Sequence, residues 1–383
     1  LATRAREHWI AGARALLSTA TMLHRSSRWG WGFFLVVCCV EPALAINLFA
    51  PSVAGMRSKS ALVGVGGVRL LRVDRQALAA LRQTDRAVLD DFPLGSAGSA
   101  TIEIERIEPF PASARVEVVG PTNTRTIALP DRRYFAGHVR GAPASRVLEI
   151  AAADTVEGFV TTDGDVYPFG PDSRGRHRSY ALTHADATQY PPPRDFCAND
   201  LDPAAIAHPS PLHAAAAQTP RLAGEGSPAL RVADLAIETD TELRNKFPTD
   251  EAALNYLTSL LAAATAIYEP DVSVRLQYSY LRLWSSGSTD PWTATSTGAA
   301  LGEVMNYWND TANHMATTAG PHDLVHFLSG KPVQGGIAYV DVLCDGNYGY
   351  GVSQVYGSFD LSNPSTIWDL VVFTHELGHN FGS

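Results

Sequence analysis

The residues best suited to chemistry lie near the end of the sequence, where His375, Glu376 and His379 form the pattern H-E-x-x-H. On a helix, residues four positions apart lie one above the other on the same face. Two imidazole nitrogens placed in this way can bind one Zn²⁺ ion. Glu376 would then lie beside the metal without binding it, where it could deprotonate a water activated by zinc. The pattern therefore predicts zinc-dependent peptide hydrolysis, with two histidine ligands and a glutamate general base.

H-E-x-x-H also occurs by chance, and the alternative is an ordinary helix with two surface histidines. Three features favour the metal site. The apolar run 370–373 precedes the motif, so the helix is expected to be buried, and buried polar groups need partners. Gly378 is expected to leave room on the helix surface near the metal. Gly382 stands where a helix can end with a positive φ.

The residues from 230 to 383 are predicted to alternate between strands and helices, which would position this last helix. Thr249 is a suitable N-cap for the first helix, and Pro364 suits the first turn of the last one. The order predicts a mixed sheet with helices packed on it. Strands are predicted at 230–239, 272–284, 323–328, 337–342 and 351–356, and helices at 250–268, 299–308 and 365–380.

The N-terminal region, residues 46–185, is predicted to be β-rich, because short alternating segments are separated by Pro, Gly, Asn and Asp. This spacing favours a sandwich or barrel-like unit. Residues 75–90 are the one predicted helix, with Leu78, Leu81 and Leu89 on one face. No motif in this region indicates chemistry. The strands are predicted at 101–107, 114–119, 124–129, 146–150 and 158–162.

Residues 186–228 differ in composition from both neighbouring regions. They include the run Pro191-Pro192-Pro193, five further prolines and an alanine run at 214–217. Such a segment buries little apolar surface, so it is predicted to be an exposed linker, and exposed linkers are where proteases cut.

A secretion signal is predicted at residues 22–45. Arg25 and Arg28 form its basic part, residues 29–40 are apolar, and residues 43–45 form an A-x-A cleavage site. The apolar run of 12 residues is short for a membrane span, and a short membrane anchor is the alternative. Residues 1–21 are expected to be an upstream segment that is not part of the natural product. Export predicts a secreted, extracellular protein of bacterial type.

The chain carries a formal net charge of −9, which becomes −12 without residues 1–45. This balance argues against nucleic acid as a partner, because phosphate binding needs clustered cations. The expected partner is a protein or peptide substrate, bound by a monomer without a stable membrane span. His314, His322 and His326 lie close together in the sequence, but they form no recognised ligand motif, so surface or core positions are expected for them.

His375, Glu376, His379 and Gly382 match the start of the metzincin motif H-E-x-x-H-x-x-G-x-x-H. The amino-acid sequence of residues 375–382 resembles that of the adamalysin/reprolysin branch, and the resemblance covers residues 229–383. It implies an α/β (α+β), zincin-like catalytic domain with a mixed, mostly parallel sheet and two long helices. The preceding β-rich domain would then be a propeptide.

Two upstream segments also resemble this branch. Residues 323–330 resemble its central strand, and residues 335–339 resemble its edge strand. In that family the edge strand borders the cleft and pairs with an extended substrate. The resemblance therefore implies substrate-binding roles for Gly336, Ile337 and Ala338.

The third histidine of the metzincin motif would fall two residues beyond Ser383, and the family's methionine-containing turn is missing as well. Two histidines bind zinc more weakly than the usual three ligands do. The expectation is a truncated fragment of a zinc endopeptidase, with little or no activity against casein. The alternative is an exported, non-enzymatic binding or adhesion protein with a degenerate protease domain, although an intact Glu376 argues against degeneracy.

The order of an exported β-rich region, a linker and a protease is that of a zymogen. In some metzincins a propeptide thiolate occupies the open zinc position, and Cys197 in the linker could do this. A thiolate is a good zinc ligand, and the neighbouring Arg194 would favour it. The alternatives are a disulfide with Cys344 and an uninvolved thiol. Cys344 is otherwise expected to pair with a cysteine beyond the chain end.

Overall fold

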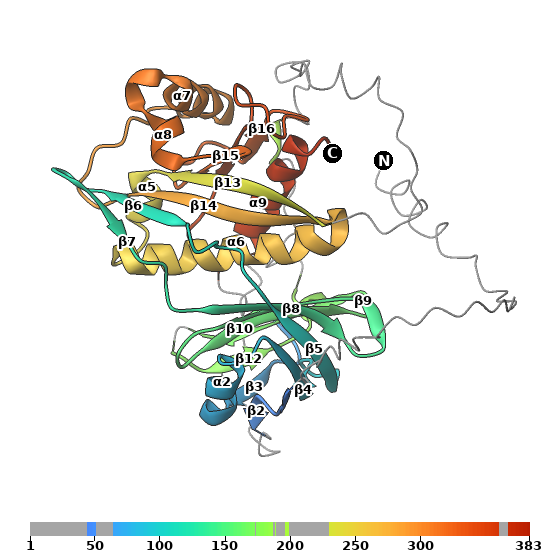
Figure 1. Cartoon of the computed structure of the whole chain (residues 1–383). Helices are drawn as coiled ribbons and strands as arrows, with labels where there is room; N and C mark the ends of the chain where they lie inside the picture. The colour runs from blue at the N-terminus through green and yellow to red at the C-terminus, as the bar shows by residue number, and fades with distance from the viewer. Residues whose placement is uncertain are drawn as a thin grey trace, which may run out of the picture. The chain divides into compact units, whose positions relative to one another are not determined.

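The structure is a computed structural model, in which two large sheets carry most of the described strands (Figure 1). Most of the predicted signal, most of the predicted linker and Pro364 lie outside the described residues. No helix among the described residues combines the length and the apolar composition needed to cross a membrane. The described residues are 44–50, 64–172, 174–186, 188, 196–198, 230–359 and 367–383.

The N-terminal strands form one ten-stranded sheet, in the order β1-β4-β5-β8-β9-β10-β11-β12-β3-β2. Of the two alternatives that the sequence offered, a sandwich or a barrel-like unit, the single sheet contradicts the sandwich. The strand pairs of the observed ten-stranded sheet are antiparallel, except that β1 pairs with β4 in parallel. The strands are β1 (Leu44–Ile46), β2 (Phe49–Ala50), β3 (Arg69–Val73), β4 (Arg86–Pro93), β5 (Ser99–Ile107), β8 (Arg133–Val139), β9 (Ala142–Ala151), β10 (Val156–Thr162), β11 (Asp165–Pro171) and β12 (His177–Ser179).

The predicted helix at 75–90 is only half correct. Helix α2 spans Arg75–Leu81, and Asp74 caps it by accepting from two backbone amides. Residues 86–93 form β4 instead, where Ala87 and Leu89 are buried and their neighbours are not. The leucines therefore come from two elements, although they share one apolar cluster. A 3-10 turn, η1 (Leu182–His184), follows β12.

The second sheet has seven strands, in the order β16-β17-β15-β13-β14-β6-β7. The four pairs from β17 to β6 are parallel, and the pair at each end is antiparallel. Strands β6 and β7 come from the region that the sequence assigned to the N-terminal β-rich domain. Their bounds are β6 (Arg115–Val119), β7 (Thr124–Ile127), β13 (Arg231–Thr239), β14 (Val274–Trp284), β15 (Leu324–Ser329), β16 (Gly336–Ala338) and β17 (Tyr350–Gln354).

Helices cover both faces of the seven-stranded sheet (Figure 1). Leu235 and Ile237 of β13 pack in one apolar cluster with α6 and α9, while Ala236 between them packs in another with α7. This alternation follows from the period-two side-chain direction of a strand. The helices are α5 (Thr241–Arg244), α6 (Asp250–Val272), α7 (Thr297–Asn309), the 3-10 turn η3 (Thr311–Asn313), α8 (Met315–Ala319) and α9 (Trp368–Asn380).

Candidate metal centre

The H-E-x-x-H motif lies on α9, and buried hydrogen bonds fix the position of this helix. Asp369 in its first turn is fully buried and accepts from the Tyr256 hydroxyl at 2.8 Å and the Tyr356 amide at 2.7 Å. Burial raises the pKa of Asp369. Directly before the motif's first histidine, the Thr374 carbonyl accepts from the Tyr268 hydroxyl at 2.7 Å. Helix α9 is therefore held to α6 at two levels.

The end of α9 is tied to the segment that follows the edge strand. The Asp341 amide donates to the His379 carbonyl at 2.8 Å. The side-chain amide of Asn380 donates to the carbonyls of Tyr339 and Tyr350, at 2.9 and 3.0 Å. Gly382 has a φ of 89°, as predicted for the residue that ends this helix. The second histidine therefore lies at a helix end that is fixed to the sheet.

Gly378 has a different role from the one predicted. A Cβ at this position would lie 2.8 Å from Ser383 Oγ and 3.5 Å from the Tyr268 hydroxyl. The small residue thus makes room for the closing turn and for the α6 tyrosine, and no metal-ligand atom is among these neighbours.

The two histidines of α9 and one cysteine converge on a single point. His375 Nε2 and His379 Nε2 are 3.2 Å apart, and Cys197 Sγ is 3.2 Å from His379 Nε2. The three ligand atoms all lie within 4.8 Å of one another, so together they could hold a metal ion. Throughout the described ranges, no second group of three such side chains comes together.

Glu376 lies beside this group, fully buried against the edge strand β16. Its Oε2 is 3.9 Å from Cys197 Sγ. A Cβ on Gly336 would come within 2.5 Å of Glu376 Oε1, so only glycine fits there. The sequence suggested a substrate-binding role for Gly336 but gave no sign of this contact, because the two residues are 40 positions apart.

The segment around Cys197 is buried, which corrects the prediction of an exposed linker at this point. Cys197 is 2% exposed and bridges to Gly336 in parallel, along the outer edge of β16. The Gly336 amide donates to the Phe196 carbonyl at 2.9 Å, and the Phe196 ring lies 5.0 Å from that of His375. Residues 196–198 therefore occupy the edge to which the sequence assigned substrate. Arg194 lies outside the described residues.

Cys197 and Cys344 are both thiols, so the disulfide between them is a wrong alternative. Cys344 is exposed in the segment between β16 and β17, and its Sγ is 3.3 Å from Oδ1 of Asp323, the residue before β15. Partial burial and the neighbouring carboxylate raise the pKa of Cys344 to about 11. Only Cys197 is brought to the two histidines.

The three other histidines of interest do not join the metal group. His326 is fully buried on β15, with Nε2 2.9 Å from Ser353 Oγ and its ring against Phe373. Burial lowers the pKa of His326 to about 3, so its imidazole is neutral. His322 Nδ1 lies 2.8 Å from the Gly320 carbonyl. His326 thus has a core position and His314 an exposed one, as the sequence suggested, and His322 is half-buried.

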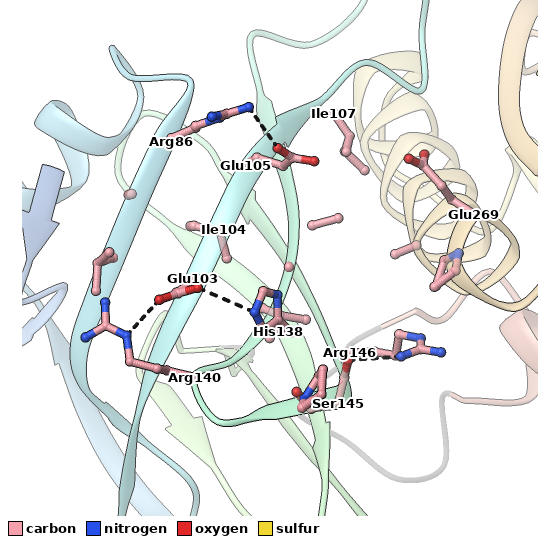
Figure 2. A pocket seen from close by; sticks show the side chains of 18 of the residues that line it. Arg86, Glu103, Ile104, Glu105, Ile107, His138, Arg140, Ser145, Arg146 and Glu269 are labelled. Atoms are coloured by element: carbon pink, nitrogen blue, oxygen red, sulfur yellow. Dashed lines mark hydrogen bonds and ion pairs between the residues drawn. The ribbon is translucent and has the colours of Figure 1, made fainter. Parts of the chain in front are cut away.

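A pocket of about 790 Å³ lies between the ten-stranded sheet and the end of α6, and no residue of the metal group lines it (Figure 2). Glu103 reaches Arg140 at 2.7 Å and His138 at 3.4 Å. Positive and negative side chains are thus paired around this pocket, which gives it no strong preference for a charged ligand. The further ion pairs are Arg86 with Glu105 and Arg146 with Asp271.

Residues 229–383 match the model of metallo-peptidase family M12. Among solved structures, the chain is similar to metalloproteinase-II from Bacteroides fragilis, with 11% identity and a TM-score of 0.39. That likeness covers 80% of this chain and 85% of the other. The family match spans every element from β13 to α9, including the paired histidines. By this match, the C-terminal part of the chain is similar to the metallopeptidases of family M12.

Proposed function

We propose that this protein is a secreted zinc metalloendopeptidase of the adamalysin/reprolysin type, made as a zymogen. The observation that carries the proposal is the meeting of Cys197 with His375 and His379. Cys197 belongs to the predicted linker and the histidines belong to α9, and their ligand atoms lie within 4.8 Å of one another. A thiolate and two imidazoles form a donor set that suits Zn²⁺.

His375, His379 and Cys197 would hold the ion in the latent protein, and a bound zinc would supply Lewis-acid polarisation of the scissile carbonyl. The Ser383 carbonyl lies 2.8 Å from His379 Nδ1, so it orients this ring and favours a proton on Nδ1. That tautomer leaves Nε2 as the ligand atom. Glu376, close by and fully buried, is the carboxylate that would accept a proton from the attacking water.

Latency has two components in this arrangement. Cys197 Sγ occupies the ligand position beside His379, and its backbone bridges to Gly336 on the edge of β16. An extended substrate would pair along that same edge, at Gly336, Ile337 and Ala338. Removing residues 196–198 would therefore open both the metal position and the substrate edge in one step.

Export is the remaining part of the proposal. The signal pattern at residues 22–45 supports it, and the compartment would be extracellular. Strand β1 begins at Leu44, so a cut after Ala45 would leave only its last residue. The expected substrate is a protein or peptide, and the expected form is a monomer.

The test combines zinc content with peptide hydrolysis. We expect about one zinc per chain, lost in H375A and H379A and bound more weakly in C197A, because one of the three proposed ligands is then missing. Without Cys197 only two histidines of the described group remain, so turnover should be slow. Adding E376Q to the C197A chain should lower this turnover by roughly 10²-fold or more and leave the zinc content unchanged. Zinc bound at these residues without Glu376-dependent hydrolysis would support a non-enzymatic protein instead.

A further inference from the structure

Strand β14 would be the edge of the seven-stranded sheet, but the hairpin β6–β7 covers it. Five residue pairs join β6 to β14 in parallel, from Arg115 with Tyr280 to Val119 with Trp284. In Figure 1 the hairpin, drawn in teal, lies beside β14, while the strands before and after it belong to the ten-stranded sheet. The family match begins at residue 229, so this strand partner comes from outside the matched region.

Both faces of β6 are anchored. Val116 and Val118 are 1% and 0% exposed, and they belong to the same apolar cluster as α6 and β13. Glu117 points to the opposite face, where it accepts from the buried Tyr280 hydroxyl at 2.7 Å. Arg115 donates to the Thr318 carbonyl of α8 at 2.8 Å. Strand β6 is thus packed as a core strand would be, while most of β7 is exposed.

The pairing also continues beyond the strand ends. The Tyr278 amide donates to the Pro109 carbonyl at 2.8 Å, and the Ser285 amide donates to the Val119 carbonyl at 2.9 Å. The ring of Phe110 lies 5.6 Å from that of Tyr278. Without these residues β14 would present a row of unpaired backbone groups, which is an open template for strand addition.

We propose that residues 109–127 are a lasting partner of the β14 edge. Cutting the chain between residues 199 and 229 would therefore leave a non-covalent two-chain protein. The partner that fits this edge is a two-stranded ribbon with valines at alternate positions and a carboxylate between them. A single cut would loosen the segment around Cys197 but would not release the N-terminal sheet. This inference does not depend on peptidase activity.

The experiment uses the full chain, with the recognition sequence of a specific protease in place of residues 214–217. The folded protein is cut and then analysed by size exclusion and native mass spectrometry. We expect both pieces to elute together at the mass of the whole chain, with amide exchange at residues 280–284 as slow as before the cut. Separation of the pieces without denaturant would overturn the proposal.

A matched pair of variants tests whether the hairpin holds the two pieces of the cut chain together. V118D places a charge in the apolar cluster, and T122D places the same charge in the exposed turn between β6 and β7. We expect dissociation of the cut chain to increase at least about tenfold in V118D and not in T122D. Equal dissociation of the two would assign the cohesion to the contacts between α6 and the ten-stranded sheet, and the proposal would fail.

A milder variant keeps the test valid if the uncut V118D chain does not fold. Y280F removes only the hydroxyl that donates to Glu117. Losing a buried hydrogen bond to a carboxylate should raise dissociation roughly fivefold. Dissociation of the cut Y280F chain as slow as that of the cut native chain would contradict a hairpin-based interface.

Discussion

The two sheets surround their buried carboxyl groups in opposite ways. Glu238 of β13 is fully buried and accepts from the indole nitrogens of Trp284 at 2.9 Å and Trp308 at 3.2 Å. Glu149 of β9 is also fully buried, but among the described residues neither of its oxygens has a hydrogen-bond partner. Glu238 therefore links β13 to β14 and α7 by hydrogen bonds. Glu149 forms no such link among the described residues, so its burial destabilises the N-terminal sheet.

The neighbours of Glu149 explain its pKa. Phe135 of β8 and Gly158 of β10 lie directly opposite it, and the Phe169 ring fills the space that a side chain on Gly158 would need. Both phenylalanines belong to the apolar cluster of this sheet. Burial alone raises the pKa of Glu149 to about 8, from an ordinary value of 4.5. The group is therefore protonated at neutral pH.

The largest effect that we predict in this comparison is a pH dependence centred on Glu149. The folded protein holds this proton up to about pH 8, whereas the unfolded chain releases it near pH 4.5. The contribution of Glu149 to the free energy of unfolding is therefore fully present below about pH 4.5, and it is lost as the pH rises to about 8. In E149Q the free energy of unfolding should exceed that of the native chain by about 4 kcal/mol at pH 8, and by little at pH 4.5.

Denaturant unfolding at several pH values measures this difference. E105Q serves as the control, because Glu105 lies on the same sheet with its side chain 62% exposed. Glu238 and Asp240 also titrate, with burial raising their pKa values to about 7 and about 6, so the comparison uses differences between variants. Parallel pH curves for E149Q and the native chain would refute the assigned role of Glu149.

A smaller effect is predicted where the C-terminal sheet meets the metal group. G336A adds a Cβ within 2.5 Å of Glu376 Oε1, in a place with no room for it. We expect a loss of stability of about 1–3 kcal/mol, and a loss of Glu376-dependent hydrolysis without a loss of zinc. The reason is that Glu376 must move, while His375 and His379 keep their helix.

G302A provides the control for that substitution. Gly302 lies on α7, and an added Cβ there would meet nothing within 4 Å. Alanine should stabilise this helix slightly, by roughly 0.5–1 kcal/mol. If G336A were as neutral as G302A for stability and hydrolysis, the close packing of Glu376 against β16 would not hold.

Much of the C-terminal region could be predicted from the sequence, because its signals are local. Thr249 does cap α6, its hydroxyl accepting from the Ala252 amide at 3.0 Å. The histidines of α9 lie together because residues four apart share a helix face. Strand pairing is not local in this sense. Residues 115–119 were correctly predicted as a strand, but nothing in the sequence indicated that their partner is β14, more than 150 positions away.

The position of Cys197 shows the same limit at the candidate site. A proline-rich composition describes residues 186–228 on average, and it predicts exposure. Burial of one short stretch depends on Gly335 and Gly336, because both lack the side chains that would clash with residue 196 or with Glu376. The sequence offered a switch, a disulfide and an uninvolved thiol as alternatives. The structure excludes the disulfide and brings Cys197 to the two histidines, and the switch itself stays a prediction.

The smallest predicted effect concerns Glu103, a carboxyl that lines the pocket in Figure 2 and whose side chain is 41% exposed. The hydrogen bond from Arg140 lowers the pKa of Glu103, so any stability it adds is present above pH 4.5 and is lost in acid. Glu103 has two partners, Arg140 and His138, whereas Glu149 has none within the part of the chain that the structure describes. Solvent screens the exposed group, so E103Q should leave the melting temperature at pH 7 unchanged within error. A shift as large as that of E149Q would mean that the number of ion-pair partners, and not burial, decides how a carboxyl affects this sheet.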